Sequence, residues 1–414
     1  MKNVIVIGGG PAGMLAAATA ANYGARVILL EKQERVGRKL KITGKGRCNI
    51  TSAREQDFIE GYMDNGAFLY GALSEFSNWD VIDFFNSRGL ATRVERGLRV
   101  FPISDNAEDV VEVLHSYMLK AGVRVLTNLE VRDIRVTDNK VTSVLTDKDE
   151  FLCEAVIVAT GGLSYPATGS TGDGYRWARH LGHSIVDLRP GLVPLVVRED
   201  FVRDLQGLSL KNVKATFVTT RGKGIAEDFG EMLFTHYGVS GPIILSMSSK
   251  VGEYLASNDS EVKLLIDLKP ALSEEKLDSR LKRDFESLAR RQFKNALEGL
   301  LPRKLIPVFI SLSGIDEDKS VSEITREERK CLLNLFKFFP LTITATRSIK
   351  EAIVTAGGIN VKEVNPKTME SKLISNLFFA GEVLDIAGYT GGFNLQAAFS
   401  TGFVAGKYAS GISA

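Results

Sequence analysis

The chain begins with the stretch that decides its fold, MKNVIVIGGGPAGMLAAATAANYGARVILLE, which runs from Met1 to Glu31. Two short apolar runs, residues 4–7 and 27–30, are rich in β-branched side chains and predict buried strands. The Ala-rich stretch between them is a good helix former. The order strand, glycine-rich turn, helix, strand predicts a βαβ unit at the start of an α/β domain.

The glycine-rich turn has the spacing of a dinucleotide-binding fingerprint. Gly8, Gly10 and Gly13 form G-x-G-x-x-G where the first strand gives way to the helix. The first glycine permits the tight turn, the second lets a pyrophosphate approach, and the third lets helix and strand pack closely. Glu31 ends the second strand, where a carboxylate accepts from an adenosine ribose. The alternative is a turn that binds no ligand. Because strand, turn, helix, second strand and terminal acid follow one another at the expected spacing, the sequence favours a dinucleotide site.

Composition bounds the class of protein. The chain has 414 residues, enough for two or more domains, and its net charge of +2 points to no polyanionic partner. The three cysteines are far apart and form no C-x-x-C, so we expect no disulfide framework, no bound metal and a reducing, cytoplasmic setting. Glycines and a proline interrupt the N-terminal apolar run. We therefore expect neither a signal peptide nor a membrane span.

The segment after Glu31, residues 32–50, is dense in glycine and in cations. Arg38, Lys39 and Arg47 are able to neutralise a pyrophosphate, and the glycines let backbone approach a ring. A solvated basic loop is the alternative. Because the segment follows a dinucleotide fingerprint, ligand contact is the favoured interpretation.

The pattern up to residue 190 alternates between helices and strands. Helix formers mixed with aromatics predict a helical layer at 57–96, and apolar spacing predicts a helix at 107–121. Residues 156–159 predict a buried strand ending in Thr160-Gly161-Gly162, and open α/β sheets bind ligands at such carboxyl ends. Further strands, partly a small β meander, are indicated at 123–126, 130–136, 140–146 and 151–154.

The centre of the chain has a different pattern. Strand-like runs are followed by a long charged helical pattern at 273–301 and by shorter helices up to 339. Residues 276–294 carry seven Lys or Arg against three acids, which indicates either an interaction face or, as the favoured interpretation, a solvated helix surface. The strand-like runs are 192–197, 213–219, 231–234 and 262–266.

The C-terminal part returns to the opening pattern. Residues 356–359 indicate a turn, and residues 377–380 predict a buried strand before Gly381-Glu382. A glycine-rich turn at 388–396 then leads into a small-residue helix at 397–409. The tail therefore completes the first domain. We expect a discontinuous domain, 1–190 with 346–414, that carries an insert at 191–345.

Several motifs together indicate a family. The opening resembles the glutathione-reductase-like class of FAD-binding flavoproteins. A narrower resemblance, over nearly the whole chain, is to the BaiN-like and aminoacetone-oxidase-like family of bacterial FAD-dependent oxidoreductases. It implies a Rossmann-like, three-layer FAD-binding domain with a parallel sheet and a β meander. It also implies an insert with a β-barrel at about 191–270 and part of 340–345, and helices at about 271–339. The motifs are GRK at 37–39, TGKGRCN at 43–49, LFTHYG at 233–238, SGP at 240–242, FAGE at 379–382 and GGFN at 391–394.

The resemblance also implies which residues bind FAD. Residues of the first turn hold the pyrophosphate, Glu31 and Lys32 lie by the adenosine ribose, and Val131 contacts adenine through its backbone. Glu382 lies where related flavoproteins place an acid on the ribityl chain, although an Asp is more common in the wider class. The residues implied are Gly8, Gly10, Pro11, Ala12, Gly13, Glu31, Lys32, Arg38, Lys39, Gly46, Arg47, Cys48, Asn49, Val131, Ala159, Thr160, Gly161, Gly162, Gly358, Gly381, Glu382, Gly391, Gly392, Asn394 and Leu395.

Candidates for catalytic groups are few. Cys48 is either a small packing residue or a reactive thiolate, with packing favoured, and no C-x-x-x-x-C pair indicates a dithiol relay. His236 is either a general acid or a structural loop residue, and Tyr389 is a third candidate. His180 and His183 read as surface histidines at a helix end rather than as metal ligands.

The leading interpretation is an FAD-dependent oxidoreductase acting on a small organic molecule. Its reaction is either NAD(P)H-dependent reduction of an enone C=C bond or oxidation of an amine with oxygen. A flavin-dependent nucleic-acid-modifying protein is an alternative from another class, and a flavin-binding sensor without turnover is a third. No second G-x-G-x-x-G is present, so a nicotinamide donor would bind transiently. We expect no stable nucleic-acid partner and no membrane association; the sequence leaves substrate identity and oligomeric state open.

Overall fold

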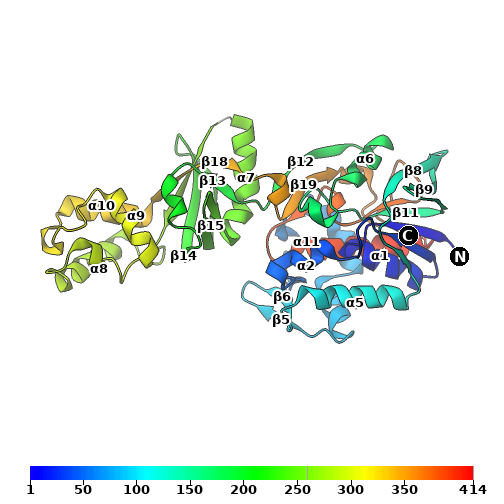
Figure 1. Ribbon diagram of the computed structural model, residues 1–414, viewed down its shortest axis with the longest axis horizontal. Helices are drawn as coiled ribbons and strands as arrows, with labels where there is room; N and C mark the ends of the chain where they lie inside the picture. The colour runs from blue at the N-terminus through cyan, green and yellow to red at the C-terminus, as the bar shows by residue number, and fades with distance from the viewer. Residues whose placement is uncertain (259, 414) are drawn as a thin grey trace. The chain divides into compact units, whose positions relative to one another are not determined.

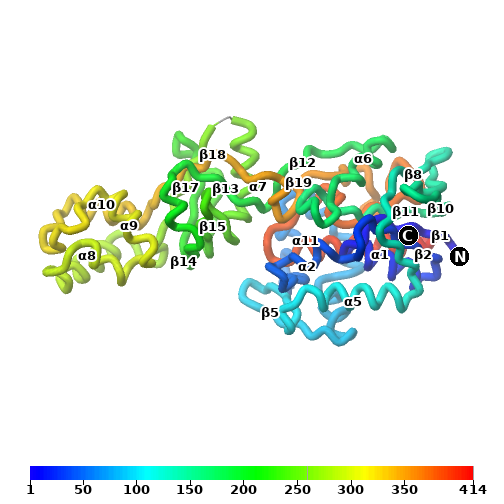
Figure 2. The backbone as a smooth tube through the Cα atoms, viewed as in Figure 1, coloured from blue at the N-terminus to red at the C-terminus, as the bar shows by residue number. Residues whose placement is uncertain are grey.

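The computed structural model describes residues 1–258 and 260–413. The chain divides into two compact units: Met1–Gly191 together with Ile349–Ala414 form unit 1, and Leu192–Ser348 form unit 2. Figure 2 shows the blue-to-green and the orange-to-red parts of the backbone interleaved in unit 1. Unit 1 is thus built from both ends of the chain.

Unit 1 is organised around a five-stranded parallel sheet with the strand order β20-β11-β1-β2-β7. Ile7 pairs with Leu30 on one side and with Val158 on the other, and Val158 pairs with Phe379. The carboxyl ends of four strands therefore meet at one edge, where α/β sheets bind ligands. The strands are β1 (Asn3–Ile7), β2 (Arg26–Leu30), β7 (Arg124–Leu126), β11 (Ala155–Val158) and β20 (Leu377–Phe379).

Smaller sheets surround this one. The expected meander is present as the antiparallel order β10-β9-β8, and the other small sheets are β3-β6-β5, β21-β4 and β12-β19. Their strands are β3 (Thr51–Ser52), β4 (Tyr62–Asp64), β5 (Thr92–Glu95), β6 (Arg99–Pro102), β8 (Val131–Thr137), β9 (Lys140–Thr146), β10 (Glu150–Leu152), β12 (Ile185–Gly191), β19 (Val354–Ile359) and β21 (Ala387–Gly388).

Two helices from opposite ends of the chain, α1 (Pro11–Asn22) and α11 (Phe393–Ala409), pack side by side in unit 1 (Figure 1). A Cβ on Gly402 would lie 2.5 Å from the carbonyl oxygen of Ala12, and a Cβ on Gly406 would overlap the carbonyl oxygen of Ala16. The small residues of both helices therefore permit a close approach of their backbones. The remaining helices of unit 1 are α2 (Arg38–Ile42), α3 (Tyr70–Glu75), α4 (Asn78–Asn86), α5 (Ala107–Lys120) and α6 (Asp173–His180).

Unit 2 contains a closed barrel with the strand order β13-β16-β15-β14-β17-β18. Its interior is apolar, and Phe217, Phe234 and Phe339 are fully buried. The strands are β13 (Leu195–Val197), β14 (Ser209–Thr219), β15 (Gly224–Thr235), β16 (Gly238–Ser240), β17 (Val262–Asp267) and β18 (Phe339–Thr346); the helices are α7 (Pro242–Asn258), α8 (Glu274–Ser287), α9 (Ile306–Ser313) and α10 (Arg326–Lys337).

The predicted fold class, a Rossmann-like α/β domain with a β-barrel and helices, is confirmed. Several local predictions were wrong. Residues 356–359 form part of strand β19 instead of a turn, because they pair with β12. The long helix at 273–301 ends at Ser287, and helix α7, which begins at Pro242, was not predicted. His183 is 2% exposed rather than on the surface, because it packs edge-on against Phe379 of β20.

Candidate functional site

The three glycines of the turn between β1 and α1 have different roles. A Cβ on Gly8, whose φ is +105°, would lie 2.5 Å from the carbonyl oxygen of Ala159. A Cβ on Gly13 would overlap the carbonyl oxygen of Gly8. A Cβ on Gly10 would meet no atom within 4 Å, so packing within the chain does not require that glycine. The space beside Gly10 is where the fingerprint places a pyrophosphate.

The N-terminus of α1 faces this space without a side-chain cap. Gly10 is the N-cap residue and Pro11 occupies the first helical position. The N–H groups of the first turn, those of Ala12 and Gly13 among them, have no partner within the helix, and the helix dipole adds partial positive charge. Such a helix start suits a phosphate group.

Glu31 is held at the end of β2 by backbone donors. Its two carboxylate oxygens accept from the N–H of Gly9 and the N–H of Gln33, each at 2.8 Å. Lys32 points elsewhere, because its Nζ forms an ion pair of 2.6 Å with Asp173 at the start of α6. Glu31 therefore has a fixed orientation and keeps acceptor capacity on both oxygens for a ribose.

Residues around β8 approach the same end of β2. The N–H of Leu129 donates to the carbonyl oxygen of Glu31 at 3.1 Å. Val131, two residues further on, is buried and begins β8. Val131 therefore lies close to the end of β2 that carries Glu31.

The three cations of the basic segment have different partners within the chain. Arg38 donates to the side chain of Gln33 at 2.8 Å, whereas Lys39 donates to Glu382 at 2.6 Å. Arg47 lies over the ring of Phe101 and is half exposed in a cluster with three other charged residues. That cluster consists of Arg47, Arg93, Glu95 and Asp105.

The loop that contains Cys48 is strained and tightly folded. Gly46 has φ +85° and Cys48 has φ +59°, and a Cβ on Gly46 would meet nothing within 4 Å. Burial raises the pKa of the Cys48 thiol to about 12, so the sulfur is protonated near neutral pH. Asn49, with its amide oriented to satisfy its neighbours, accepts from the N–H of Gly392 at 3.0 Å. These facts favour the packing role for Cys48.

The carboxyl end of β11 carries an orphaned polar group. Thr160 follows Ala159 at this end, and its Oγ1 is buried without a hydrogen-bond partner among the residues that the structure describes. Gly161 has φ +71°, and a Cβ on Gly162 would overlap the hydroxyl of Thr355. A buried hydroxyl without a partner at this edge of the sheet suits a ligand that supplies the missing hydrogen bond.

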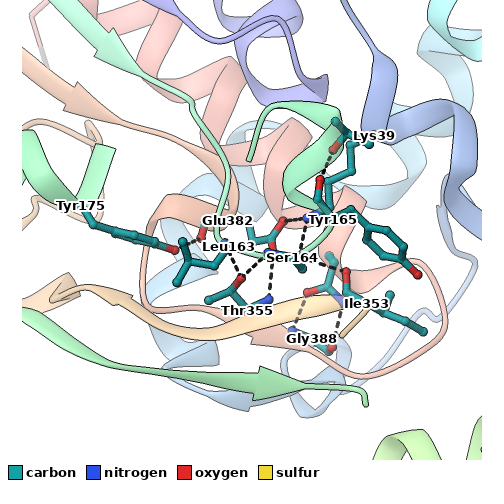
Figure 3. A network of polar contacts seen from close by, with 11 residues as sticks. Lys39, Leu163, Ser164, Tyr165, Tyr175, Ile353, Thr355, Glu382 and Gly388 are labelled. Atoms are coloured by element: carbon teal, nitrogen blue, oxygen red, sulfur yellow. Dashed lines mark hydrogen bonds and ion pairs between the residues drawn. The ribbon is translucent and has the colours of Figure 1, made fainter. Parts of the chain in front are cut away.

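Glu382 is the centre of a polar network that joins three segments of unit 1 (Figure 3). Its carboxylate accepts from Lys39, from the hydroxyl of Ser164 and from the N–H of Thr355. Burial alone would raise the pKa of Glu382, but Lys39 and these hydrogen bonds outweigh it and hold the pKa below its ordinary value. Gly381, the preceding residue, donates from its N–H to Thr401 at 2.9 Å.

Packing within the chain leaves no room for a side chain at two glycines of the C-terminal turn. A Cβ on Gly392, whose φ is +99°, would overlap the backbone of Thr51, and a Cβ on Gly391 would lie 2.9 Å from the ring of Phe393. Asn394 holds the turn by accepting from the N–H of Gly388 and donating to its carbonyl, both at 2.8 Å. Packing within the chain therefore opposes a side chain at both glycines.

The other predicted residues near this turn are placed as follows. Tyr389 is partly exposed, and its N–H donates to the carbonyl oxygen of Gly61 at 2.8 Å. Leu395 is partly buried in the first turn of α11. Gly358 lies on β19, where a Cβ would lie 2.9 Å from the backbone nitrogen of Asp385.

Three polar residues of unit 1, Ser164, Thr355 and Asp385, were not predicted from the sequence. Ser164 and Thr355 belong to the Glu382 network, and both are fully buried. Asp385 accepts from Asn65, and burial together with the charge of Asp64 raises its pKa above the ordinary value. Only the position of Asp385 three residues after Glu382 gave a signal in the sequence.

His236 belongs to unit 2, where it lies exposed in the turn between β15 and β16. Its ring is 4.7 Å from that of Tyr237, and the guanidinium of Arg347 lies over the Tyr237 ring at 4.5 Å. The hydroxyl of Thr235 is buried without a hydrogen-bond partner in the described part of the chain. This arrangement leaves the His236 side chain accessible to a ligand.

The basic helix is partly neutralised. In α8, Arg280 pairs with Asp284 at 3.3 Å and Lys282 pairs with Asp278 at 2.7 Å. Lys294, further along the chain, pairs with Asp318 at 2.6 Å. Across residues 1–258 and 260–413 there is no cluster of side chains suited to a metal ion, and none of the helices is long and apolar enough to cross a membrane.

A parallel sheet with a glycine-rich βα turn and an acid at the end of β2 defines the Rossmann-type class of dinucleotide-binding proteins. The chain belongs to the family described as HI0933-like protein Rossmann domain, whose model matches residues 2–408. This membership confirms the family indicated by the sequence motifs. The chain therefore belongs to a family of flavoprotein oxidoreductases.

Two curated relatives and one solved structure show the extent of the similarity. The chain is 33% identical over 413 residues to a 3-dehydro-bile acid delta(4,6)-reductase from Clostridium scindens, covering 99% of both chains. It is 34% identical over 404 residues to a ribosomal RNA dihydrouridine synthase from Haemophilus influenzae, covering 96% of both. The structure of 3-ketosteroid delta1-dehydrogenase from Sterolibacterium denitrificans matches 99% of this chain and 100% of that one, with a TM-score of 0.54 and 13% identity. At this identity, the similarity to the Sterolibacterium denitrificans structure shows a shared fold and no more.

Proposed function

We propose that this protein is an FAD-dependent reductase that saturates a C=C bond conjugated to a carbonyl group, with NAD(P)H as the electron donor. One observation carries the proposal: two full-length relatives with unlike substrates have names that describe the same chemistry. A delta(4,6)-reductase of a 3-dehydro acid reduces double bonds conjugated to a ketone. A dihydrouridine synthase reduces the uracil double bond that is conjugated to a ring carbonyl.

The residues of unit 1 fit FAD. The space beside Gly10, the uncapped start of α1 and the orphaned hydroxyl of Thr160 suit a ligand with phosphate and polar groups. Glu31 would hold the adenosine ribose and Glu382 the ribityl chain. When bound, the flavin supplies the exchange of a hydride between donor and substrate.

The protein's own residues have three tasks in this reaction. The βα turn binds and orients the cofactor through its backbone, and the Glu382 network fixes polar groups beside it. When the double bond is reduced, the carbon next to the carbonyl group also takes up a proton, so a general acid is required. Cys48 is unsuited to exchange a proton with a substrate, because its buried thiol has a pKa of about 12. His236 and Tyr389 remain the proposed candidates, since both side chains are at least partly exposed.

Anaerobic stopped-flow mixing of the FAD-loaded protein with NADH and with NADPH tests the reaction. We expect at least one nucleotide to bleach the flavin within seconds and a 3-keto-4,6-diene steroid or uridine-containing RNA to restore its colour. An amine that bleaches the flavin, followed by reoxidation with oxygen and no response to either nucleotide, would favour the alternative oxidase. A flavin that no donor reduces would indicate a sensor.

RNA is a second candidate substrate, favoured by the Haemophilus influenzae relative and by the exposed cations near α8. Lys276, Arg290 and Arg291 are exposed. If RNA is the substrate, its affinity should fall steeply between low and physiological salt, because phosphate contacts release counterions. A steroid ketone should show almost no such dependence, and charge reversal at Arg290 and Arg291 should affect RNA alone.

A further inference from the structure

Two aspartates of unit 1, Asp64 and Asp385, lie near each other in unlike surroundings. Asp64 ends β4, and its Oδ2 forms an ion pair of 3.0 Å with Nη2 of Arg189 on β12. Asp385 has no ion pair among the residues that the structure describes. Its carboxylate accepts from neutral donors, the Asn65 amide at 2.8 Å and the N–H of Gly357. Arg189 thus neutralises Asp64 and leaves Asp385 without a cation.

These surroundings favour a proton on Asp385. Burial and the negative charge of Asp64 raise its pKa, and the opposing effects of its hydrogen bonds and of Arg189 are smaller. Tyr175 of α6 also faces Asp385, but its phenol is neutral because burial raises its pKa well above the ordinary value. Two carboxyl groups whose surroundings move their pKa values apart are typical of an acid and its partner at a catalytic site.

The strands that carry Arg189 and Gly357 are irregular at this point. The register of β12 against β19 shifts between Val186 and Arg189, and Gly357 has φ +83°. Such irregularities re-aim side chains and are over-represented next to active sites. The Nε of Arg189 is buried and has no hydrogen-bond partner within residues 1–258 and 260–413. An acceptor is therefore missing here, which the oxygen of a substrate or of a water molecule would supply.

Asp385 lies next to two segments that the sequence assigns to the flavin. Its N–H donates to the carbonyl oxygen of Ile359 at 3.0 Å, and a Cβ on Gly358 would lie 2.9 Å from its nitrogen. Three residues further on, Gly388 donates to Asn394 of α11. Asp385 is also partly exposed, so its carboxyl group exchanges protons with water.

We propose that Asp385 is the proton donor of the reaction. This inference rests on the proposed reduction of a C=C bond conjugated to a carbonyl group. A hydride from the reduced flavin enters at the β-carbon, and the electron pair of the C=C bond moves towards the carbonyl oxygen. The O–H bond of Asp385 then breaks as the α-carbon takes up its proton. Water returns a proton to the Asp385 carboxylate, so each turnover consumes one NAD(P)H and one proton.

Asp64 and Arg189 are positioning residues in this scheme, because they act on the substrate through Asp385. Asp64 keeps a negative charge beside the acid, and Arg189 holds Asp64 in place. The scheme adds Asp385 to the candidates His236 and Tyr389, and unlike His236 it belongs to the same unit as the predicted flavin residues.

The two half-reactions of the FAD-loaded, full-length protein test the proposal in stopped-flow mixing. In Asp385→Asn, bleaching of the flavin by the nucleotide should stay within about twofold of the wild type. Reoxidation by the enone that serves the wild type should slow by about 100-fold or more, as expected for loss of a general acid. Asp385→Glu should recover part of this loss. Asp109→Asn is the matched control, since Asp109 also accepts from an asparagine amide, that of Asn106 at 2.9 Å.

The neighbours of Asp385 give a second test, which holds even if Asp385→Asn does not fold. Reoxidation should slow as pH rises through the pKa of Asp385, because only the protonated carboxyl donates. This alkaline limb should move to lower pH in Asp64→Asn, which loses a negative charge, and to higher pH in Arg189→Gln, which loses a positive one. A limb that stays in place in both variants would overturn the proposal.

The remaining outcomes separate this inference from the proposed function. Reoxidation of Asp385→Asn at the wild-type rate would refute the inference alone, and so would equal losses in both half-reactions, which indicate a structural role. A wild type that neither nucleotide reduces, or that no enone reoxidises, would refute the proposed function as well.

Discussion

Gly392 lies so close to Thr51 that a Cβ on the glycine would overlap the threonine backbone. The two residues are far apart in the chain, and the contact docks the start of α11 on strand β3. Asn49 adds to this junction by accepting from the Gly392 N–H at 3.0 Å. The glycine thus serves the fold, whatever it contributes to the flavin.

Gly392→Ala should destabilise the protein. Both the φ of +99° and the overlap with Thr51 oppose a side chain, and such strain costs about 1–3 kcal/mol. Chemical denaturation should show a lower free energy of unfolding. FAD that remains bound should keep nearly its wild-type reduction potential. A stable variant with a shifted potential would support the opposite view, in which the turn tunes the flavin.

Gly10→Ala should weaken FAD binding with little effect on stability, which is the reverse of the result expected for Gly392→Ala. Its φ of −79° suits alanine and its Cβ would meet no protein atom within 4 Å, so the stripped protein should lose less than about 1 kcal/mol. FAD affinity should fall at least tenfold, because the methyl group would occupy the approach to the helix start. Equilibrium dialysis measures the affinity, and wild-type affinity in this variant would place the pyrophosphate elsewhere.

Glu31→Ala should weaken FAD retention without changing FMN binding. The two N–H groups that orient Glu31 lie at the adenosine end of the proposed site, and FMN lacks an adenosine. The released cofactor can be identified by chromatography after heating. Release of FMN from the wild-type protein would contradict the assignment of Glu31. Glu34→Ala offers a control, since Glu34 is an exposed neighbour with only long ion pairs.

Thiol labelling should distinguish the cysteines. Cys48 is 0% exposed with a thiol pKa of about 12, whereas Cys331 is exposed. Iodoacetamide at neutral pH should therefore modify Cys331 rapidly and Cys48 only after unfolding, as peptide mass spectrometry would show. Cys48→Ser should still support reduction by a nicotinamide cofactor. Rapid labelling of Cys48 in the folded protein would restore it as a reactive candidate.

The sequence predicted the parts of the site that depend on local pattern. The strand, turn, helix and acid of residues 4–31 follow from short-range periodicity and glycine spacing, and the structure has them in that order. It could not predict the partners of Lys39 or Arg47, because a long cation reaches carboxylates from distant segments. Lys39 meets Glu382 across 343 positions, and Arg47 meets Glu95 across 48. Helix α7 was missed because its apolar residues were interpreted as part of a β domain.

His183 shows the same limit, since nothing local marks it as buried. Its Nε2 lies 2.8 Å from Ser371 Oγ, and that oxygen already accepts from the N–H groups of Leu373 and Ile374. Ser371 must therefore donate to His183, which leaves the imidazole neutral with its proton on Nδ1, towards the carbonyl oxygen of Ala178. Burial lowers the pKa of His183, against the raising influence of this carbonyl and of Glu363.

Stability should accordingly depend on pH through His183. The unfolded chain binds this proton at about pH 6.5, and the folded protein binds it only at lower pH. The stabilisation is therefore present above about pH 6.5 and is lost as pH falls through the folded pKa. Thermal unfolding between pH 5.5 and 7.5 should show a midpoint that falls towards acid in the wild type.

His183→Gln should be less stable at pH 7.5, by about 1–3 kcal/mol for the buried hydrogen bond, but should lack this component of the pH dependence. His180→Gln, on the exposed end of α6, should retain the wild-type profile. Parallel curves for wild type and His183→Gln would show that the buried histidine does not titrate in this range.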